Sequence, residues 1–382
     1  MNKIHTFELC ATTTAAGYQL CKNVFYETAK KETIGCCFEI GEKLVYTYWS
    51  YKGVVVYLQK NKKDQAYANI YFRINPMELI SAFGDICIDD SEERTQTCSK
   101  APEPNALYEY SHARNLHLLI AFAELLKEFP LNIKLDQLHL NRVDITEDIY
   151  MPDKKSLYAY LKLVKKGLDH PNWDTQEFGD FRDTYSIRRA SSRYQVTVYD
   201  KTQQMAGRFL HWDPNQSILR IEAALLTPGI RHMRKKYGLP GGVWYATLFS
   251  LLECNDLILS YILSKLLPAG NYYSLGEAKR IIRASNYRED RKQALIDFLT
   301  DINRHKTISM YQLKQTKSGK LRIKQLEYLG INLVTLNARE KIPFLPSLFR
   351  LLYPVVPVPY YAKEKTMYCS FEDNKLAISS RK

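Results

Sequence analysis

The chain has 382 residues, 46% of them hydrophobic and 25% charged, and 54 Lys and Arg against 41 Asp and Glu give a formal net charge of +13. This length exceeds one ordinary core and predicts two domains, while no run of apolar residues is long enough to span a membrane. The basic surplus favours nucleic acid as a partner over a cationic surface kept only for solubility.

The eight cysteines form no CxxC pair, and no His/Cys cluster has the spacing of a zinc site. The N-terminal "MNKIHTFELC" lacks the apolar segment of a secretory signal. We therefore expect a cytoplasmic protein with reduced thiols and no membrane partner.

The first part of the chain is typical of strands. The segments 43–59 and 65–80 are rich in Val, Tyr and Ile, and the polar "KNKKD" between them predicts an antiparallel hairpin. Asn75 and Pro76 favour the start of a short helix. The polar segment 89–105 carries two prolines and predicts a loop.

Further along, helical and strand patterns alternate and then become mainly helical. This order predicts an α+β fold, with an antiparallel central sheet, helices packed on one face and a helical C-terminal domain. We expect domains at 1–240 and 241–345, then a proline-rich tail at 346–382. The predicted elements are helices at 106–129, 154–168, 243–267, 274–284 and 288–305, strands at 133–150, 184–204 and 217–228, and short basic helices within 308–333.

Three of the predicted strands share one pattern, in which one face is apolar and the alternate face carries ionisable groups. A solvent-exposed outer face with weak cross-strand ion pairs would explain any one of them. Three such strands in succession favour a chemically active site, if the strands share a sheet. The polar positions are Arg142, Asp144 and Thr146 on the first, Gln195, Thr197, Tyr199 and Lys201 on the second, and Arg220 and Glu222 on the third.

These residue types suit cleavage of a phosphodiester. Two carboxylates can hold Mg²⁺ or Mn²⁺ through oxygen ligands, and a tyrosine can attack the phosphorus. A free phenol has a pKa of about 10 and needs a cation nearby to ionise. Lys201 lies two residues after Tyr199, about 6–7 Å along a strand.

The segments "RVDIT", "VTVYDKTQQ" and "LRIEAAL", in this order, resemble rolling-circle replication initiators of the filamentous-phage and staphylococcal plasmid class. The resemblance covers roughly residues 65–335 and includes "INPMELI", "GNYYSLGEAKRII" and "QLEYLGINLVTL". The chain departs from the pattern at Gln203 and Gln204, where many relatives carry an acid, and at Asn141, which stands where a second metal-binding histidine would be.

The resemblance implies a metal-dependent endonuclease that nicks and rejoins one DNA strand at an origin through a phosphotyrosine, leaving a 3′-OH that primes synthesis. It implies Tyr199 as the nucleophile, with Tyr194 and Tyr185 as alternatives and Lys201 beside it. A structural role for Tyr199 within its strand is an equal alternative. Candidate metal ligands are Asp144, Glu222, Asp200 and His139, although a lone histidine is more often structural. Candidate DNA-binding residues of this region are Arg142, Arg193 and Arg220.

Two alternatives remain open, a non-catalytic DNA-binding regulator of a phage or plasmid on the same scaffold and a conjugative relaxase. The basic helices near the C-terminus either grip duplex origin DNA through its phosphates or form a solvated basic face. A host helicase and a second copy of the chain are further candidate partners. The basic candidates in these helices are Lys314, Lys317, Lys320, Arg322 and Lys324.

Overall fold

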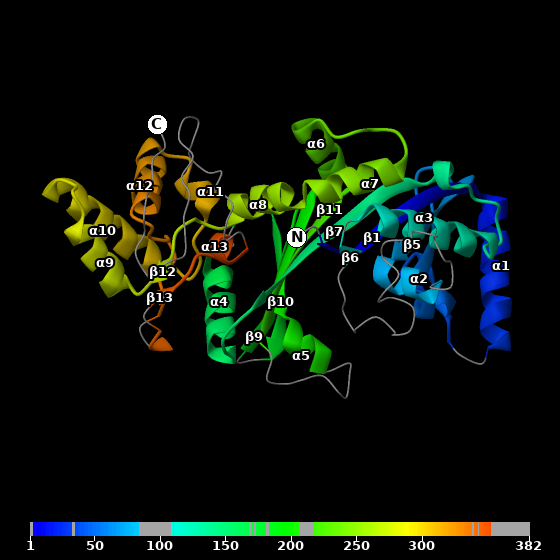
Figure 1. Cartoon of the computed structure of the whole chain (residues 1–382), viewed down its shortest axis with the longest axis horizontal. Helices are drawn as coiled ribbons and strands as arrows, with labels where there is room; N and C mark the ends of the chain where they lie inside the picture. Colours follow the sequence, from blue (N-terminus) through cyan, green and yellow to red (C-terminus); the bar gives the residue numbers. More distant parts are fainter. Residues whose placement is uncertain are drawn as a thin grey trace. The chain divides into compact units, whose positions relative to one another are not determined.

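The chain folds into two compact units, and each draws on several separate segments (Figure 1). The computed structural model describes residues 3–32, 35–83, 108–109, 111–167, 170–171, 173–180, 183–206, 217–337, 340–342 and 344–352. Unit 1 comprises Met1–Thr146, Ser192–Tyr194 and Ala223–Ile258, and unit 2 comprises Glu147–Ser191, Gln195–Glu222 and Leu259–Lys382. This division does not follow the boundary that the sequence suggested near residue 240. The expected loop at 89–105 and the tail beyond residue 352 lie outside the described residues.

The sheet of unit 1 has the strand order β2-β3-β4-β5-β1-β7-β11, with β6 paired to β1. Strands β4 and β5 form the predicted hairpin, with Tyr57 opposite Tyr71. The expected strand at 43–59 is broken by a 3₁₀ turn, Tyr48–Lys52, and by Gly53, whose φ of 71° suits glycine. The strands are β1 Lys3–Thr14, β2 Cys37–Ile40, β3 Lys43–Tyr46, β4 Val54–Lys60, β5 Tyr67–Ile74, β6 Tyr108–Glu109, β7 His139–Tyr150 and β11 Ile218–Leu226.

Helices cover one face of this sheet, where aromatic side chains form the core. Trp244 stacks on Phe7 with ring centroids 5.8 Å apart, and Phe122 packs edge-on against Phe72. Asn75 caps the second helix as predicted, since its side chain accepts hydrogen bonds from Met77 and Glu78. The helices are α1 Ala15–Lys31, α2 Pro76–Ala82, α3 His112–Lys127, α6 Thr227–Tyr237 and α7 Trp244–Glu253, with a 3₁₀ turn at Leu135–Gln137.

Unit 2 contains the strand order β7-β11-β10-β9-β8, and α4 connects this sheet to the C-terminal helices. Tyr160 of α4 donates to the carbonyl of Pro346, and the amide of Ile308 donates to the carbonyl of Lys166. The strands are β8 Asp174–Asp180, β9 Asp183–Ala190 and β10 Tyr194–Asp200, with a small pair β12 Tyr272–Tyr273 and β13 Phe344–Leu345. The helices are α4 Lys154–Gly167, α5 Lys201–Ala206, α8 Asn255–Leu266, α9 Leu275–Ala284, α10 Glu289–Arg304, α11 Met310–Leu313, α12 Lys317–Tyr328 and α13 Leu348–Leu352.

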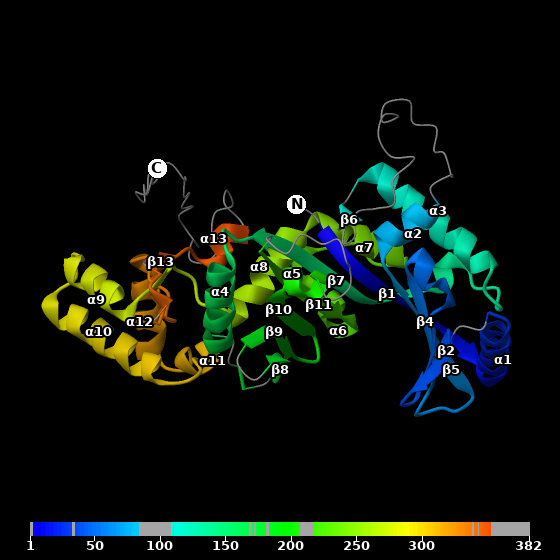
Figure 2. The same ribbon diagram turned by 90° about the horizontal axis from the view of Figure 1, so that it is seen from below.

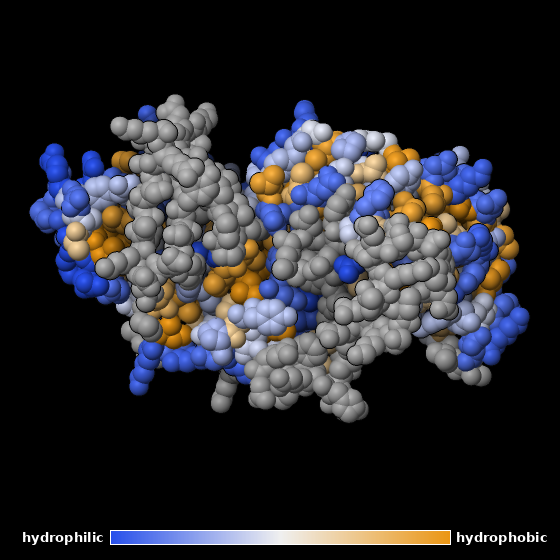
Figure 3. Space-filling model, in the orientation of Figure 1, coloured by the Kyte–Doolittle hydropathy of each residue, from blue (hydrophilic) through white to orange (hydrophobic). Residues whose placement is uncertain are grey.

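The helices α9 to α12 share a hydrophobic core of their own within unit 2 and group together in both ribbon views (Figures 1 and 2). Hydrophilic side chains gather on the outer surface over α9 and α10 (Figure 3). The fold is thus α+β with a mainly helical C-terminal region, as the sequence predicted. Among the described helices, none alone is long and apolar enough to cross a membrane, although the bent pair α7 and α8 passes that test together.

Candidate functional site

The three strands that carry the polar motifs are neighbours in one sheet. The strand with "LRIEAAL", β11, lies between β7 and β10. Arg220 and Glu222 therefore face residues of both neighbours on the polar side, while Leu219, Ile221 and Ala223 are completely buried on the other. Arg220 and Glu222 thus lie on the same side of the sheet, as the alternation along the strand predicted.

Tyr199 of β10 and Glu222 of β11 form the central contact of this side. The hydroxyl of Tyr199 donates a 2.7 Å hydrogen bond to Oε1 of Glu222. Burial, then the charge of Glu222, raises the pKa of the Tyr199 phenol well above its ordinary value, and Arg220 opposes that rise. The phenol therefore keeps its proton in the folded protein. Tyr199 is thus a protonated phenol that donates to a carboxylate, not a phenol ionised by a lysine.

Arg220 lies beside this pair and is held by a carboxylate that the sequence analysis did not select. Its Nε and Nη2 donate to the two oxygens of Asp148 at 2.5 and 2.6 Å. Burial alone would lower the pKa of Arg220, but its bonds and attraction to Asp148 outweigh burial and raise the pKa. The Nη1 atom is buried and has no hydrogen-bond acceptor among the described residues. The guanidinium is thus a fixed cation whose Nη1 points no N–H group at an acceptor among the described residues.

Asp148 could have been found from the sequence, because it continues the polar parity of Asp144 and Thr146 along β7. Arg220 was a candidate DNA-binding residue, and it is completely buried.

Lys201 and Asp200 differ from their expected roles because the strand ends at Asp200. Asp200 accepts a 3.0 Å hydrogen bond from the amide of Gln203, and so stabilises the start of α5. Lys201 is the first residue of α5, and its ammonium donates to Gln204 at 2.7 Å. Its Nζ still lies 6.0 Å from the centre of the Tyr199 ring. Lys201 is therefore near Tyr199 through the start of a helix, not through strand alternation.

Asp144 belongs to a second polar cluster, which lies in unit 1. Its carboxylate accepts hydrogen bonds of 2.6 Å from Thr6 and from Nε of Arg142, and Arg73 approaches to 3.7 Å. Asp144 is buried, so these cations balance a desolvated charge. Arg142 is thereby committed to a carboxylate. Thr6 and Arg73 come from strands outside the three motifs, and the motifs alone gave no signal for them.

The remaining candidates have other surroundings or lie outside what is described. Tyr194 is 2% exposed and packs at 6.5 Å from the ring of His232 under α6. Arg193 is exposed, and His139 is exposed opposite Cys10. Tyr185 lies in β9, and its side chain is outside the described part of the chain.

The proposed metal ligands do not form a recognisable ion site. Among the described residues, no group of three or more His, Cys, Asp or Glu is arranged to hold a metal ion. Asp144 already accepts from two protein donors, Asp200 caps a helix and Glu222 accepts from a phenol. The donors present therefore do not fit Mg²⁺ or Mn²⁺ in the arrangement described.

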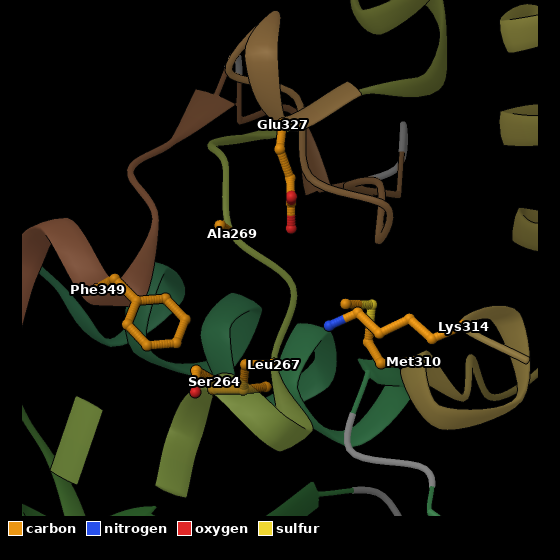
Figure 4. A pocket seen from close by; sticks show the side chains of 7 residues that line it. All are labelled: Ser264, Leu267, Ala269, Met310, Lys314, Glu327 and Phe349. Carbon is orange, nitrogen blue, oxygen red and sulfur yellow. The ribbon is translucent and has the colours of Figure 1, made fainter. Parts of the chain in front are cut away.

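The basic C-terminal candidates divide into an inward and an outward set. Lys314 lines a cavity of about 10 Å³, room for roughly one water, together with Glu327 and Met310 (Figure 4). Burial lowers the pKa of Lys314. Arg322 is half-buried, with its guanidinium 5.4 Å from the centre of the Phe298 ring. The exposed members are Lys317, Lys320 and Lys324.

No family model matches the sequence, and no curated protein matches it. Among solved structures, the chain is similar to the di-domain ARO/CYC BexL from the BE-7585A biosynthetic pathway, at 12% identity and a TM-score of 0.20. That match covers 67% of this chain and 94% of the other. A TM-score this low carries no argument about fold or function.

Proposed function

We propose that the protein is a replication initiator of the rolling-circle type, which nicks and rejoins one DNA strand through Tyr199. The observation that carries the proposal is the hydrogen bond from Tyr199 to Glu222 beside the Arg220 guanidinium. A nucleophile, a base and an oriented cation are the parts that transfer of a phosphodiester to tyrosine needs. The net charge of +13 supports a nucleic-acid substrate.

In the nicking step, Oη of Tyr199 forms a bond to phosphorus while its proton passes to Glu222. The bond between phosphorus and the 3′ oxygen breaks, and that oxygen becomes the 3′-OH by taking the proton that Glu222 releases through a water molecule. Arg220, oriented by Asp148, stabilises the charge that develops on the phosphoryl oxygens. Reversal of the same step rejoins the strand and returns the proton to Tyr199.

A requirement for Mg²⁺ or Mn²⁺ stays a prediction that rests on the resemblance alone. The arrangement of donors gives it no support, and the step above does not use an ion. Assays with each metal and with EDTA decide it directly.

The test is covalent capture of DNA. The full chain is incubated with a 3′-labelled pool of randomised single strands, with Mg²⁺, Mn²⁺ or EDTA, and separated under denaturing conditions. We expect a protein–DNA adduct, with Tyr199 as the attached residue in peptide mapping. Tyr199→Phe should abolish the adduct and Glu222→Gln should slow its formation about 10²- to 10⁴-fold. Attachment at Tyr194 or Tyr185, with full activity of Tyr199→Phe, would reassign the nucleophile.

A second candidate, a non-catalytic DNA-binding regulator, is favoured by one observation. Tyr199 is 7% exposed, and the pKa of its phenol is raised, so the side chain has the surroundings of a structural residue. This candidate predicts DNA binding without any adduct in the same assay, and equal binding by wild type and Tyr199→Phe. A relaxase, the third alternative, would form the adduct as well and differs in its biological context.

A further inference from the structure

In unit 2 the four-residue helix α11 is joined to α12 by a short turn. Between them lie three residues, Lys314, Gln315 and Thr316, which is a length found in the turn of a helix–turn–helix. The side chain of Thr316 accepts a 2.9 Å hydrogen bond from the amide of Gly319 and so caps the start of α12. The turn is therefore a fixed corner between two helices.

Gly319 allows the two helices to approach closely. A Cβ atom at this position would lie 2.1 Å from the carbonyl oxygen of Leu313, the last residue of α11. That distance excludes any side chain without backbone movement. The first turn of α12 is thus held directly against the end of α11.

The two sides of α12 have opposite character. Gly319, Ile323 and Leu326 are buried, and Ile323 and Leu326 join a core with Leu295 and Leu299 of α10. Residues at the spacing i, i+3, i+4, i+7 and i+11 form the opposite side, which we call the outer face. All five members are exposed: Lys317, Lys320, Leu321, Lys324 and Tyr328.

The outer face combines positive charge with exposed apolar groups. From Ile302 to Leu326 the sequence contains no Asp or Glu, while Arg304, Lys306 and five further lysines and arginines lie within it. Leu321 is 57% exposed and Tyr328 67% exposed, although neither contributes to the core. Such a face is complemented by a polyanion that carries apolar groups between its charges. Duplex DNA is a polyanion of this kind, because thymine methyl groups lie in its major groove.

We infer that α12 is a recognition helix that enters the major groove of duplex DNA with its outer face. Lys317, Lys320 and Lys324 contact phosphates or guanine edges, and Leu321 meets the floor of the groove. Lys314 and Arg322, which the sequence pattern grouped with them, are excluded because they face inward or pack on Phe298. The inference rests on the proposed function for the choice of DNA, but it concerns duplex binding and not strand cleavage.

The test compares two triple variants of the full chain that carry the same change in charge. One is Lys317→Gln, Lys320→Gln and Lys324→Gln, and the control is Lys31→Gln, Lys63→Gln and Lys134→Gln, at exposed lysines of unit 1. Fluorescence anisotropy measures binding to a 30-base-pair duplex of randomised sequence over a range of NaCl concentrations. We expect the first variant to reduce the slope of log K against log salt by about 2 to 3 and the control to leave it unchanged. Equal slopes for the two variants would overturn the inference.

A second measurement identifies the groove. Duplexes that bind wild type are selected from the randomised pool and treated with dimethyl sulfate before binding. We expect methylation of guanine N7, in the major groove, to interfere, and Leu321→Ala to alter the selected sequences. Interference only by minor-groove methylation would contradict the inference. Duplex binding that depends on α12 without any covalent adduct would refute the proposed nicking activity alone, and an adduct with α12-independent duplex binding would refute this inference alone.

Discussion

Arg220 is a buried cation whose charge is balanced by Asp148. Because its side chain is 1% exposed and that of Asp148 is 16% exposed, water screens the pair poorly. We expect Asp148→Asn to lower the free energy of unfolding by about 3 to 5 kcal/mol, since it leaves the guanidinium buried with a weaker partner. Urea denaturation followed by circular dichroism measures the change.

The matched control for this prediction breaks an exposed ion pair. Lys127 and Glu124 pair at 2.6 Å with side chains that are 70% and 39% exposed. Glu124→Gln should change the free energy of unfolding by about 0.5 kcal/mol or less. A similar loss of unfolding free energy in both variants would show that the burial of Arg220 does not increase the cost of breaking its ion pair.

Cys21 on the inner side of α1 links stability to alkaline pH. It is completely buried, and burial raises the pKa of its thiol to about 12. An unfolded chain releases this proton at about pH 8.5. Because the pKa is higher in the folded state, the contribution of Cys21 is complete below about pH 8.5 and is lost as the pH rises toward 12.

We therefore expect the free energy of unfolding of wild type to fall faster than that of Cys21→Ala between pH 9 and 11, by about 1.4 kcal/mol for each pH unit. Urea titrations at a series of pH values measure both curves. Parallel curves would show that the thiol ionises equally in the folded and unfolded states.

The sequence predicted the polar side of the central strands but not the partners on it. Alternation along a strand fixes the side of the sheet that Tyr199, Arg220 and Glu222 occupy. The structure places Tyr199 in contact with Glu222. Parity along β7 also places Asp148 on this side, but which residue of a neighbouring strand lies opposite depends on register, so its pairing with Arg220 could not be predicted. Lys201 was misplaced because a helix begins there, and the turn from strand to helix ends the alternation.

At the level of elements, the hairpin β4–β5 and the helices α4, α9 and α10 follow the predicted segments closely, because their apolar periodicity is sustained. Helix α3 begins only at His112, and the start of the segment predicted as helix instead contains β6, Tyr108–Glu109. Helix α1 was not predicted, since its region was interpreted as strands. It forms because Thr14 caps it and because Tyr18, Cys21 and Phe25 recur at helical spacing and are buried. In short amphipathic segments next to strands, the local sequence pattern is a weak guide to whether a helix or a strand forms.

Gly319 and Gly276 are two helical glycines with different surroundings, which gives a matched test of the α11–α12 corner. A Cβ at Gly319 meets the Leu313 carbonyl, whereas nothing lies within 4 Å of a Cβ at Gly276 in α9. We expect Gly319→Ala to lower the free energy of unfolding by about 1 to 3 kcal/mol, through the clash. Gly276→Ala should raise it by up to about 1 kcal/mol, because alanine favours helix.

Thermal and urea denaturation of the two variants measure these opposite effects. A stabilised Gly319→Ala would mean that α11 and α12 separate without cost, and would remove the fixed corner on which a recognition helix depends.

For the whole molecule, the change in composition near residue 240 does not coincide with the boundaries of the compact units. The sequence becomes helical there, but contacts assign residues up to Ile258 to unit 1 and assign Glu147–Ser191 to unit 2. Strand β7 contributes residues to both units without interruption. Composition reports the type of local structure, whereas the division into units depends on long-range packing that one sequence does not display.

This difference predicts the behaviour of a chain that ends at residue 240. Such a chain lacks Trp244, which is 2% exposed, stacks on Phe7 and donates from Nε1 to the carbonyl of Leu135 at 2.9 Å. Since the core of unit 1 is then open beside β1, we expect no cooperative thermal transition in near-ultraviolet circular dichroism. In the full chain, Trp244→Ala should retain a transition but lose about 3 to 5 kcal/mol. A sharp transition of the 1–240 chain would show instead that α7 is an addition to a core complete without it, and that the compositional boundary is also the folding boundary.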